Sequence, residues 1–221
     1  MLNKLLSASV MCADLLNMGK SVSDLKEAGI DYLHIDIMDG CFVPNITLGF
    51  DLVNSIKKGS DIPLDVHMMV SEPKRFFDRM NLSENDILCV HYEACENVSE
   101  TLSLIKEKGC KVGLAINPLT PVEAIKEFAE LVDMILVMTV TPGFAGQKMF
   151  EGAEEKVKKC REILDNMGLS DIPIQVDGNI SFENGAKLSK AGADIFVQGT
   201  SSLFMKDMSI KDAAEKFRKV L

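Results

Sequence analysis

Short apolar segments rich in valine and isoleucine alternate eight times with longer amphipathic segments in this chain of 221 residues. The short segments predict strands and the longer ones predict helices, because buried strands are brief apolar runs whereas surface helices carry an apolar stripe. Eight successive strand–helix units predict a (β/α)8 TIM barrel that occupies residues 1–221 as a single domain. The predicted strands span residues 5–11, 32–38, 63–69, 87–92, 111–116, 134–140, 173–177 and 194–199, and the predicted helices span roughly residues 16–28, 49–58, 73–80, 97–108, 121–130, 152–167, 182–190 and 209–220.

A doubly wound open sheet is the competing architecture. Open sheets of this kind often carry a G-x-G-x-x-G turn after the first strand, and no such turn follows residues 5–11. The chain is 47% hydrophobic, which is enough to fill the core of one domain. The closed barrel is therefore favoured.

The composition limits the classes of partner. A formal net charge of −9 argues against nucleic acid, which requires a basic face, and it means that local features must hold any anionic ligand. No segment approaches the roughly 18 apolar residues of a membrane span, and Asp14 interrupts the apolar N-terminal segment, which argues against a signal peptide. The six cysteines form no C-x-x-C pair, so free thiols in a reducing compartment are expected. We expect a cytoplasmic protein without membrane or nucleic-acid partners.

Polar residues gather near the ends of the predicted strands. In residues 32–38, His34 and Asp36 alternate with isoleucines, so a period of two turns both polar side chains to one side. The next predicted strand carries Asp65 and His67 in the same alternation, and the third histidine, His91, lies near the end of the strand after that. Active sites of TIM barrels lie at the carboxyl ends of the strands. All three histidines at this end indicate a functional site.

The His-x-Asp and Asp-x-His pairs on neighbouring strands suit one divalent metal ion. Imidazole and carboxylate ligands at this spacing are typical of sites for zinc, manganese, iron or cobalt. Asp177, at the end of the seventh predicted strand, adds a carboxylate from across the barrel. Asp65 is either a ligand, a residue that supports a ligand, or a structural acid lower in the barrel.

The loops after the last three predicted strands indicate a phosphate site. TPGFAGQ (141–147), DGN (177–179) and QGTSS (198–202) contain small residues that leave backbone N–H groups exposed. In TIM barrels the usual phosphate site lies after strands seven and eight and is completed by the N-terminus of a short helix. The segment TSSLF after Gly199 is the candidate for that helix. Binding through backbone amides also fits a rim without lysine or arginine.

The absence of a lysine at the strand ends excludes two enzyme classes that use this fold. A Schiff-base aldolase requires such a lysine. Decarboxylases of related barrels have a D-x-K-x-x-D pattern on the third strand, and this chain has Asp65-Val66-His67 at that place.

Motifs spread over nearly the whole chain resemble the ribulose-phosphate 3-epimerase family, whose barrel is of the ribulose-phosphate-binding type. The motifs are S-x-x-x-A-D-L from Ser9, HIDIMDGCFVPNITLG, LDVHMMVSEP, VGLAINPLTP, MTVTPGFAGQKMF, VDGNI and AGADIFVQGTSSLF. SVMCADLL, GFAGQ and GTSSLF are most similar to the D-allulose 6-phosphate 3-epimerase branch, although MTVTPGF and HMMVS also occur in pentulose-phosphate epimerases.

The resemblance implies a role for each motif residue. His34, Asp36, His67 and Asp177 would bind one divalent metal ion, and Asp36 and Asp177 would also act as acid and base in a 3-epimerisation through an enediolate. Ser9 and His67 would contact the substrate. Three methionines would line the site, and three pairs or runs of residues would hold the phosphate. The methionines are Met38, Met69 and Met138, and the phosphate residues are Gly146, Gln147, Gly178, Asn179, Gly199, Thr200 and Ser201.

Three residues depart from the family pattern, and the last two of them, which lie in the phosphate cradle, concern the substrate. Cys41 stands where the family usually has histidine, Ala145 where pentulose epimerases usually have glycine, and Asn179 where they usually have a second glycine. The Thr200-Ser201-Ser202 run also departs from the pentulose pattern. Because Asn179 and these hydroxyls can donate hydrogen bonds to a longer substrate, we expect D-allulose 6-phosphate to be converted to D-fructose 6-phosphate.

Three alternatives stay open at this point. The first is conversion of D-ribulose 5-phosphate to D-xylulose 5-phosphate, and the second is a metal-dependent aldolase. The third is a barrel that binds a sugar phosphate without turnover, although opposed carboxylates at Asp36 and Asp177 are not needed for binding alone. A homo-oligomer is expected.

Overall fold

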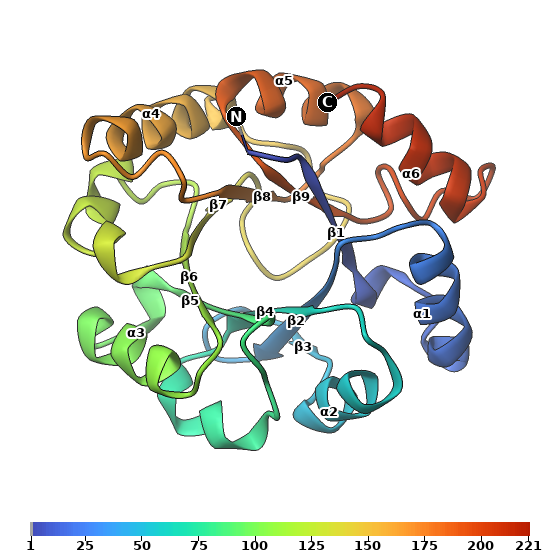
Figure 1. Ribbon diagram of the computed structural model, residues 1–221, viewed down its shortest axis with the longest axis horizontal. Helices are drawn as coiled ribbons and strands as arrows, with labels where there is room; N and C mark the ends of the chain where they lie inside the picture. The colour runs from blue at the N-terminus through green and yellow to red at the C-terminus, as the bar shows by residue number, and fades with distance from the viewer. Residues whose placement is uncertain (1) are drawn as a thin grey trace.

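The computed structural model describes residues 2–221 and forms a closed barrel of parallel strands surrounded by helices (Figure 1). The sheet order is β1-β9-β8-β7-β6-β5-β4-β2-β3, and β1 also pairs in parallel with β2, which closes the barrel. This closure confirms the predicted TIM barrel and excludes an open sheet. The eight barrel strands are β1 (Leu5–Ser9), β2 (Tyr32–Asp39), β4 (Leu64–Met69), β5 (Ile87–His91), β6 (Lys111–Ile116), β7 (Met134–Met138), β8 (Ile174–Asp177) and β9 (Ile195–Gln198).

A ninth strand, which the sequence pattern does not predict, lies outside the barrel. The two residues of β3 (Ile46–Thr47) pair antiparallel with the end of β2. This strand is too short for its alternation to show in the sequence. The strands predicted over residues 5–11 and 134–140 end two residues earlier than expected, at Ser9 and Met138, because the chain turns there to form the rim.

Six α-helices and several 3₁₀ helices form the outer ring (Figure 1). The segments predicted as helices over residues 73–80 and 121–130 are 3₁₀ rather than α-helical, which is common for helical segments of only one or two turns. The α-helices are α1 (Met18–Glu27), α2 (Phe50–Gly59), α3 (Val98–Glu107), α4 (Ala153–Asn166), α5 (Phe182–Ala191) and α6 (Ile210–Arg218), and the 3₁₀ helices are η1 (Val10–Cys12), η2 (Leu15–Asn17), η3 (Pro73–Arg79), η4 (Tyr92–Ala94), η5 (Val122–Glu127) and η6 (Ala129–Leu131). None of the helices within residues 2–221 is both long and apolar enough to cross a membrane.

The alternation along each strand divides the core into two parts. Outward-facing strand residues such as Ile35 and Ile37 pack with the helices in the main hydrophobic cluster. A smaller cluster that includes Leu136 and Ile195 fills the inside of the barrel. Burial of both strand faces removes apolar surface from water on each side of the sheet, and this burial stabilises the closed barrel.

The register of β2 and β4 brings the polar residues to one level of the barrel. Along these two parallel strands, His34 lies opposite Asp65 and Asp36 lies opposite His67. Because side chains alternate with a period of two, all four point to the barrel interior. The next matched pair, Met38 and Met69, lies nearer the carboxyl ends of the strands.

Candidate active site

Four buried or half-buried side chains from three strands converge at the carboxyl end of the barrel. His34 and Asp36 come from β2, His67 from β4 and Asp177 from β8. One possible ligand atom from each side chain lies within 4.8 Å of the ligand atoms of the other three. The Oδ1 atom of Asp36 is 3.2 Å from both Nε2 of His34 and Nδ1 of His67. The Oδ2 atom of Asp177 is 3.9 Å and 3.7 Å from the same two nitrogens.

A hydrogen bond with Asp65, on the side away from the ligand cluster, fixes the ring of His34. Its Nδ1 lies 2.7 Å from Oδ2 of Asp65, so its Nε2 is the nitrogen that faces the ligand cluster. Asp65 also accepts hydrogen bonds from Ser7 Oγ at 2.8 Å and from Gln175 Nε2. Asp65 is not part of the ligand cluster. Of the roles left open for it, the structure favours that of a residue supporting His34.

The ring of His67 faces the cluster with its other nitrogen, Nδ1. Its Nε2 lies 2.8 Å from Nε2 of His91, which is fully buried. Nδ1 of His91 lies 3.2 Å from Oε2 of Glu93, and the ring of Phe42 covers His91 at a centroid distance of 4.8 Å. The sequence placed His91 at this end of the barrel but assigned no specific role to it, and it did not indicate Glu93.

The two carboxylates of the cluster differ in their electrostatics. Burial alone would raise the pKa of Asp36, but His34 and His67 beside it lower that pKa below its usual range. Burial raises the pKa of Asp177 to about 6, against the attraction of the two histidines. Before any ligand binds, Asp36 is therefore the ionised carboxylate and Asp177 the one that readily holds a proton.

The histidines also differ in their electrostatics. Burial would lower the pKa of His34, but the carboxylates of Asp65 and Asp36 outweigh it and raise that pKa well above its usual value. Burial lowers the pKa of His91 to about 4, although Glu93 acts in the opposite direction. His91 is therefore neutral near pH 7, whereas His34 compensates the neighbouring negative charge.

The donor set fits a divalent ion. Two imidazole nitrogens and two carboxylates, all directed to one point, are ligands that zinc and the neighbouring transition metals accept. The imidazoles that bind a metal are neutral, so they would leave an excess of negative charge from Asp36, Asp65 and Asp177 in this largely buried site. A bound cation would relieve this excess.

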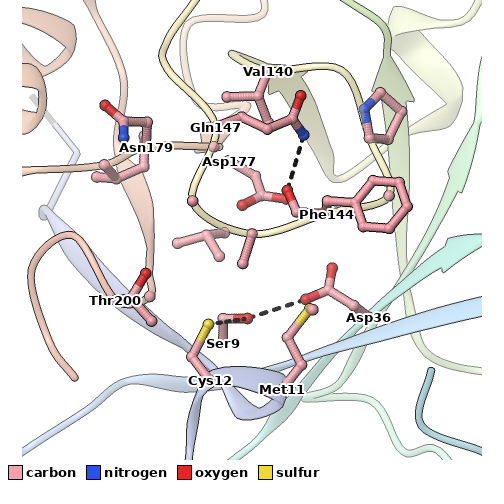
Figure 2. Close-up of a pocket in the computed structure, with 18 of the residues that line it drawn as sticks. Ser9, Met11, Cys12, Asp36, Val140, Phe144, Gln147, Asp177, Asn179 and Thr200 are labelled. Carbon is pink, nitrogen blue, oxygen red and sulfur yellow. Dashed lines mark hydrogen bonds between the residues drawn. The ribbon is translucent and has the colours of Figure 1, made fainter. Parts of the chain in front are cut away.

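A pocket of about 570 Å³, including solvent space at its mouth, opens above the cluster. Figure 2 shows the carboxylates of Asp36 and Asp177 reaching into this pocket from different strands. Ser9 donates a hydrogen bond of 3.1 Å to Oδ2 of Asp36 and lies at the pocket floor. The residues lining the pocket include neither lysine nor arginine. All predicted site residues except His34 and His67, which lie beneath the carboxylates, line this pocket: Ser9, Asp36, Met38, Met69, Met138, Gly146, Gln147, Asp177, Gly178, Asn179, Gly199, Thr200 and Ser201.

The loop after β8 has a backbone that few residues can adopt. Gly178 has a φ of +115°, and a Cβ atom there would lie 2.5 Å from Cγ2 and 2.9 Å from the backbone nitrogen of Val140. Only glycine fits this position. Asn179 has a φ of +53°, a left-handed conformation in which asparagine is the most tolerated residue after glycine. Its Oδ1 accepts a hydrogen bond of 2.9 Å from Asn184, and its Nδ2 donates to Ser201 at 3.4 Å.

The segment after β9 corrects one prediction. TSSLF does not form a short helix; it folds into turns around the carbonyl oxygen of Gly199. That oxygen accepts hydrogen bonds from the backbone N–H groups of Leu203 at 3.0 Å and Phe204 at 3.1 Å. The turns hold Thr200 and Ser201 at the pocket wall.

The loop after β7 closes the opposite wall. Gln147 Nε2 donates to the carbonyl oxygens of Thr141 at 2.6 Å and Phe144 at 2.9 Å, so its side-chain amide stabilises the loop (Figure 2). Phe144 is 52% exposed beside the pocket mouth. Sequence reasoning placed Gln147 here but did not indicate that its amide is occupied within the loop.

Several pocket residues have no signal in the sequence pattern. Met11 and Cys12 come from η1, where the sequence pattern predicted a continuing strand. Val140 follows β7 and reaches the pocket through the course of the loop, whereas Val197 lies within β9, two residues after the inward-facing Ile195. The two inner methionines Met38 and Met69 pack with Val43 in a small apolar cluster beside the ligands.

Comparison with known proteins identifies the family. A sequence model described as the ribulose-phosphate 3 epimerase family matches residues 5–204. Ribulose-phosphate 3-epimerase from Bacillus subtilis is 41% identical over 193 residues, which make up 87% of this chain and 89% of that protein. The chain belongs to the ribulose-phosphate 3-epimerase family. Two further proteins of the same name are each 37% identical to this chain. The match to the protein from Aquifex aeolicus covers 93% of this chain and 92% of that protein. The match to the protein from Escherichia coli K12 covers 89% of this chain and 88% of that protein.

Membership of the ribulose-phosphate 3-epimerase family establishes the reaction class. The protein is an isomerase, and its reaction is the 3-epimerisation of a ketose phosphate. The expected family is confirmed, whereas the similarity to the D-allulose 6-phosphate branch stays a prediction.

Solved structures with low identity share the fold alone. 3-Hexulose-6-phosphate synthase aligns over 99% of both chains with a TM-score of 0.64 and 17% identity. A mutant tryptophan synthase alpha-subunit from Pyrococcus furiosus aligns over 100% of this chain and 97% of its own with a TM-score of 0.64 and 13% identity. At these identities the likeness extends to the barrel and not to the chemistry.

Proposed function

We propose that this epimerase interconverts D-ribulose 5-phosphate and D-xylulose 5-phosphate. The observation that carries the proposal is the agreement between the relatives and the site. Proteins 37–41% identical over most of the chain are all named ribulose-phosphate 3-epimerase. The residues that the family resemblance assigns to catalysis lie together at the floor of one pocket.

The conformation of Asn179 removes one argument for the hexulose. The expectation of D-allulose 6-phosphate rested partly on Asn179 as an additional donor to the substrate. Its side chain is instead engaged with Asn184 and Ser201, and its φ of +53° gives a backbone reason for asparagine in place of glycine. This departure from the family pattern is therefore compatible with an unchanged substrate.

D-Allulose 6-phosphate is the second candidate. The observation that favours it is the composition of the pocket wall, where Ala145 and the hydroxyl of Thr200 differ from the pentulose pattern. With C2 and C3 held at the same place, a hexulose phosphate puts its phosphate one carbon farther away. A wall with additional hydroxyl donors can discriminate between such ligands.

His34, Asp36, His67 and Asp177 would hold one divalent metal ion, with zinc, iron, manganese and cobalt as the candidates. When bound, this ion supplies Lewis-acid stabilisation of the negative charge that develops on the substrate oxygens. Asp65 and His91 orient the two histidine rings from the side opposite the cluster.

Asp36 and Asp177 would transfer the protons. The hydrogen on C3 is weakly acidic because the neighbouring C2 carbonyl delocalises the charge left by its removal. One carboxylate takes this proton from one face of C3, and the other carboxylate, in its protonated form, returns a proton to the opposite face. The raised pKa of Asp177 suits a group that exchanges a proton near neutral pH. His34 and His67 hold the pKa of Asp36 below its usual value, which keeps this carboxylate ionised before the substrate binds.

Backbone N–H groups of the three small-residue loops would hold the phosphate. Gly146 and Gln147 lie after β7, Gly178 and Asn179 after β8, and Gly199, Thr200 and Ser201 after β9. The absent side chain of Gly178 leaves room for Val140, and its φ of +115° sets the course of the backbone along the pocket. Ser9 at the pocket floor is the remaining proposed substrate contact. His67, predicted as a further contact, does not line the pocket, and its two ring nitrogens face His91 and the ligand cluster, so its proposed role is that of a metal ligand. Met38, Met69 and Met138 would exclude water around the reacting carbons.

Parallel kinetics on the two ketose phosphates test the substrate proposal. We expect a higher kcat/KM for D-ribulose 5-phosphate than for D-allulose 6-phosphate in the metal-loaded enzyme. Asn179→Gly should leave the ratio of the two values unchanged, because glycine adopts the same left-handed backbone. A preference for the hexulose that shrinks in Asn179→Gly would contradict the proposal and favour the second candidate. Cleaved three-carbon products in either reaction would indicate an aldolase.

A homo-oligomer also stays a proposal. Leu15 and Leu16, in η2 beside the barrel rim, are 54% and 95% exposed. Exposed leucines next to each other are the feature of the described surface that supports association. Light scattering coupled to gel filtration measures the state in solution.

A further inference from the structure

The third histidine of the chain has no role in the proposed proton transfer, yet it is fully buried beside a proposed metal ligand. His91 lies on β5, next to β4, and its Nε2 is 2.8 Å from Nε2 of His67. The two ring planes are 26° apart and the centroids 4.9 Å apart. With the nitrogens in hydrogen-bond contact, these values mean that the rings meet edge to edge, as an N–H···N hydrogen bond requires.

The direction of this hydrogen bond decides whether His67 can bind a metal. Nδ1 of His67 is the nitrogen that faces Asp36 and Asp177. A metal-binding nitrogen must offer its lone pair, so the ring proton of His67 must reside on Nε2. That proton can only be donated to a lone pair on Nε2 of His91. The reverse direction would place a proton on Nδ1 of His67 and block metal binding.

The carboxylate of Glu93 sets the direction of the hydrogen bond between His67 and His91. When Nε2 of His91 accepts a hydrogen bond, the neutral ring carries its proton on Nδ1. This Nδ1 lies 3.2 Å from Oε2 of Glu93, a carboxylate that can only accept. The Nε2–H of His67 therefore points to His91, and the Nδ1–H of His91 points to Glu93. Both groups point away from the ligand cluster.

The carboxylate of Glu93 is itself anchored. Its Oε1 accepts a hydrogen bond of 2.8 Å from the backbone N–H of Asn117 and another from the hydroxyl of Thr120. The buried ammonium of Lys156 holds the same loop by donating to the carbonyl oxygens of Thr120 at 2.7 Å and Pro118 at 3.1 Å. The loop after β6, which Lys156 of α4 holds, thus anchors the carboxylate of Glu93.

We propose that His91 and Glu93 are positioning residues that fix the ring orientation and the proton position of His67, so that its Nδ1 lone pair faces the metal. This inference rests on the proposed metal site. A hydrogen-bonded partner on the second nitrogen is how proteins orient a metal-binding histidine, and removal of such a partner typically costs about 10–100-fold in metal affinity.

Equilibrium binding of Co²⁺ and Zn²⁺ to the metal-free full-length protein, in competition with a chromophoric chelator, tests the proposal. His91→Phe keeps a ring of similar shape against Phe42 but removes the acceptor for His67. We expect its dissociation constant for either metal to rise by about 10–100-fold and the visible spectrum of the Co²⁺ form to change. His91→Gln, whose amide can accept and donate, should recover part of this loss.

Two further variants separate positioning from stability. Glu93→Gln can keep its contacts to Asn117 and Thr120 through an oxygen while it turns an N–H₂ group to His91, which reverses the preferred proton positions. We expect weaker metal binding from this variant too, whereas Glu96→Gln, in the same segment but away from His91, should bind as the wild type does. A purely structural role would lower the unfolding temperature without changing the dissociation constant.

The outcomes distinguish this inference from the metal site itself. His91→Phe and Glu93→Gln with wild-type dissociation constants and an unchanged Co²⁺ spectrum would overturn the positioning role. If His91→Phe fails to fold, as judged by circular dichroism, the result for Glu93→Gln decides. Failure of the wild type to bind either metal would overturn the metal site and the positioning role together.

Discussion

Asp177 is the residue on which the proposed proton transfer depends most directly. Its pKa of about 6 arises from burial beside Asp36 and Asp65, and its carboxylate reaches into the pocket from β8 (Figure 2). Asp177→Asn cannot accept a proton, so kcat for epimerisation should fall by roughly 10²–10⁴-fold. Inhibition by inorganic phosphate should stay close to that of the wild type, because backbone groups form the proposed cradle.

The same mechanism predicts where solvent hydrogen enters the product. Turnover by the wild type in D₂O should place deuterium at C3, because the proton returned to C3 comes from a carboxylate that exchanges with water. Mass spectrometry or NMR of the product measures the label. Product without deuterium at C3 would be incompatible with transfer between two carboxylates.

Asp86 is a buried carboxylate that does not line the pocket, and its substitution measures how such a group contributes to stability. It accepts hydrogen bonds from the backbone N–H groups of Leu64 at 2.8 Å and Ser83 at 2.7 Å, and it pairs with Lys57 at 2.6 Å. Burial alone would raise the pKa of Asp86, but these partners hold it below its usual value. Asp86→Asn should lower the free energy of unfolding by about 1–3 kcal/mol.

The pH dependence follows from the sign of that shift. A lowered pKa means that the unfolded chain binds the proton more readily, so the contribution is present above the unfolded pKa of about 3.9 and is lost as the pH falls through the folded value. Urea unfolding between pH 7 and pH 3 should show a smaller acid loss in Asp86→Asn than in the wild type. Asp61→Asn is the control, because Asp61 is 72% exposed and pairs only with Lys26. If the free energy of unfolding fell equally between pH 7 and pH 3 in Asp86→Asn and Asp61→Asn, burial of Asp86 would not be the cause of its contribution.

At the scale of elements, a glycine lets α5 and α6 approach closely. A Cβ atom on Gly185 in α5 would lie 2.3 Å from Cζ of Phe217 in α6, and Phe217 is fully buried against Phe196 and Phe182. Gly185→Ala should therefore destabilise the protein by about 1–3 kcal/mol, despite the higher helix propensity of alanine.

Gly19 in α1 provides the matched control for this prediction. A Cβ atom there would have no heavy atom within 4 Å, and the residue is helical. Gly19→Ala should leave stability unchanged or increase it by up to about 1 kcal/mol. Chemical denaturation of both variants gives the comparison, and equal effects would mean that Phe217 moves aside without cost.

At the scale of the whole molecule, closure makes every barrel strand depend on two neighbours. β1 pairs with both β2 and β9, so the first and last strands of the chain join the barrel together. The assignment of residues 1–221 to one domain stays a prediction, and it implies that the chain unfolds cooperatively.

A comparison of probes checks this cooperativity. The chain has no tryptophan and two tyrosines, Tyr32 in β2 and Tyr92 in η4. Tyrosine fluorescence and far-UV circular dichroism should give coincident urea unfolding curves. Two separated transitions would show that the barrel unfolds in parts.

Sequence periodicity was sufficient for the strands and helices of the barrel. Each barrel strand is a short apolar run that is buried on both faces, and such runs are visible without any tertiary information. The alternation of His34 and Asp36 with isoleucines also predicted which side chains face inward. The position of Asp177 followed from the rule that catalytic residues lie at the carboxyl ends of strands.

The details that depend on contacts between distant segments could not be predicted in this way. The support of His34 by Asp65 and Gln175 joins β2, β4 and β8, and the hydrogen bond between His67 and His91 joins β4 and β5. The turns around Gly199, predicted as a helix, depend on how the chain returns from β9 to α6. Each of these features is a long-range contact, which local composition does not encode.

By itself the sequence determined the order of strands and helices, the inward faces and the family motifs, because periodicity and motif spacing are properties of neighbouring residues. Tertiary structure alone decided which nitrogen of each histidine faces the ligand cluster. It also decided that the amides of Asn179 and Gln147 are engaged within the protein. The physical reason is that hydrogen-bond partners and burial are set by segments brought together when the barrel closes, and those partners determine the charge, orientation and proton position of each side chain in the site.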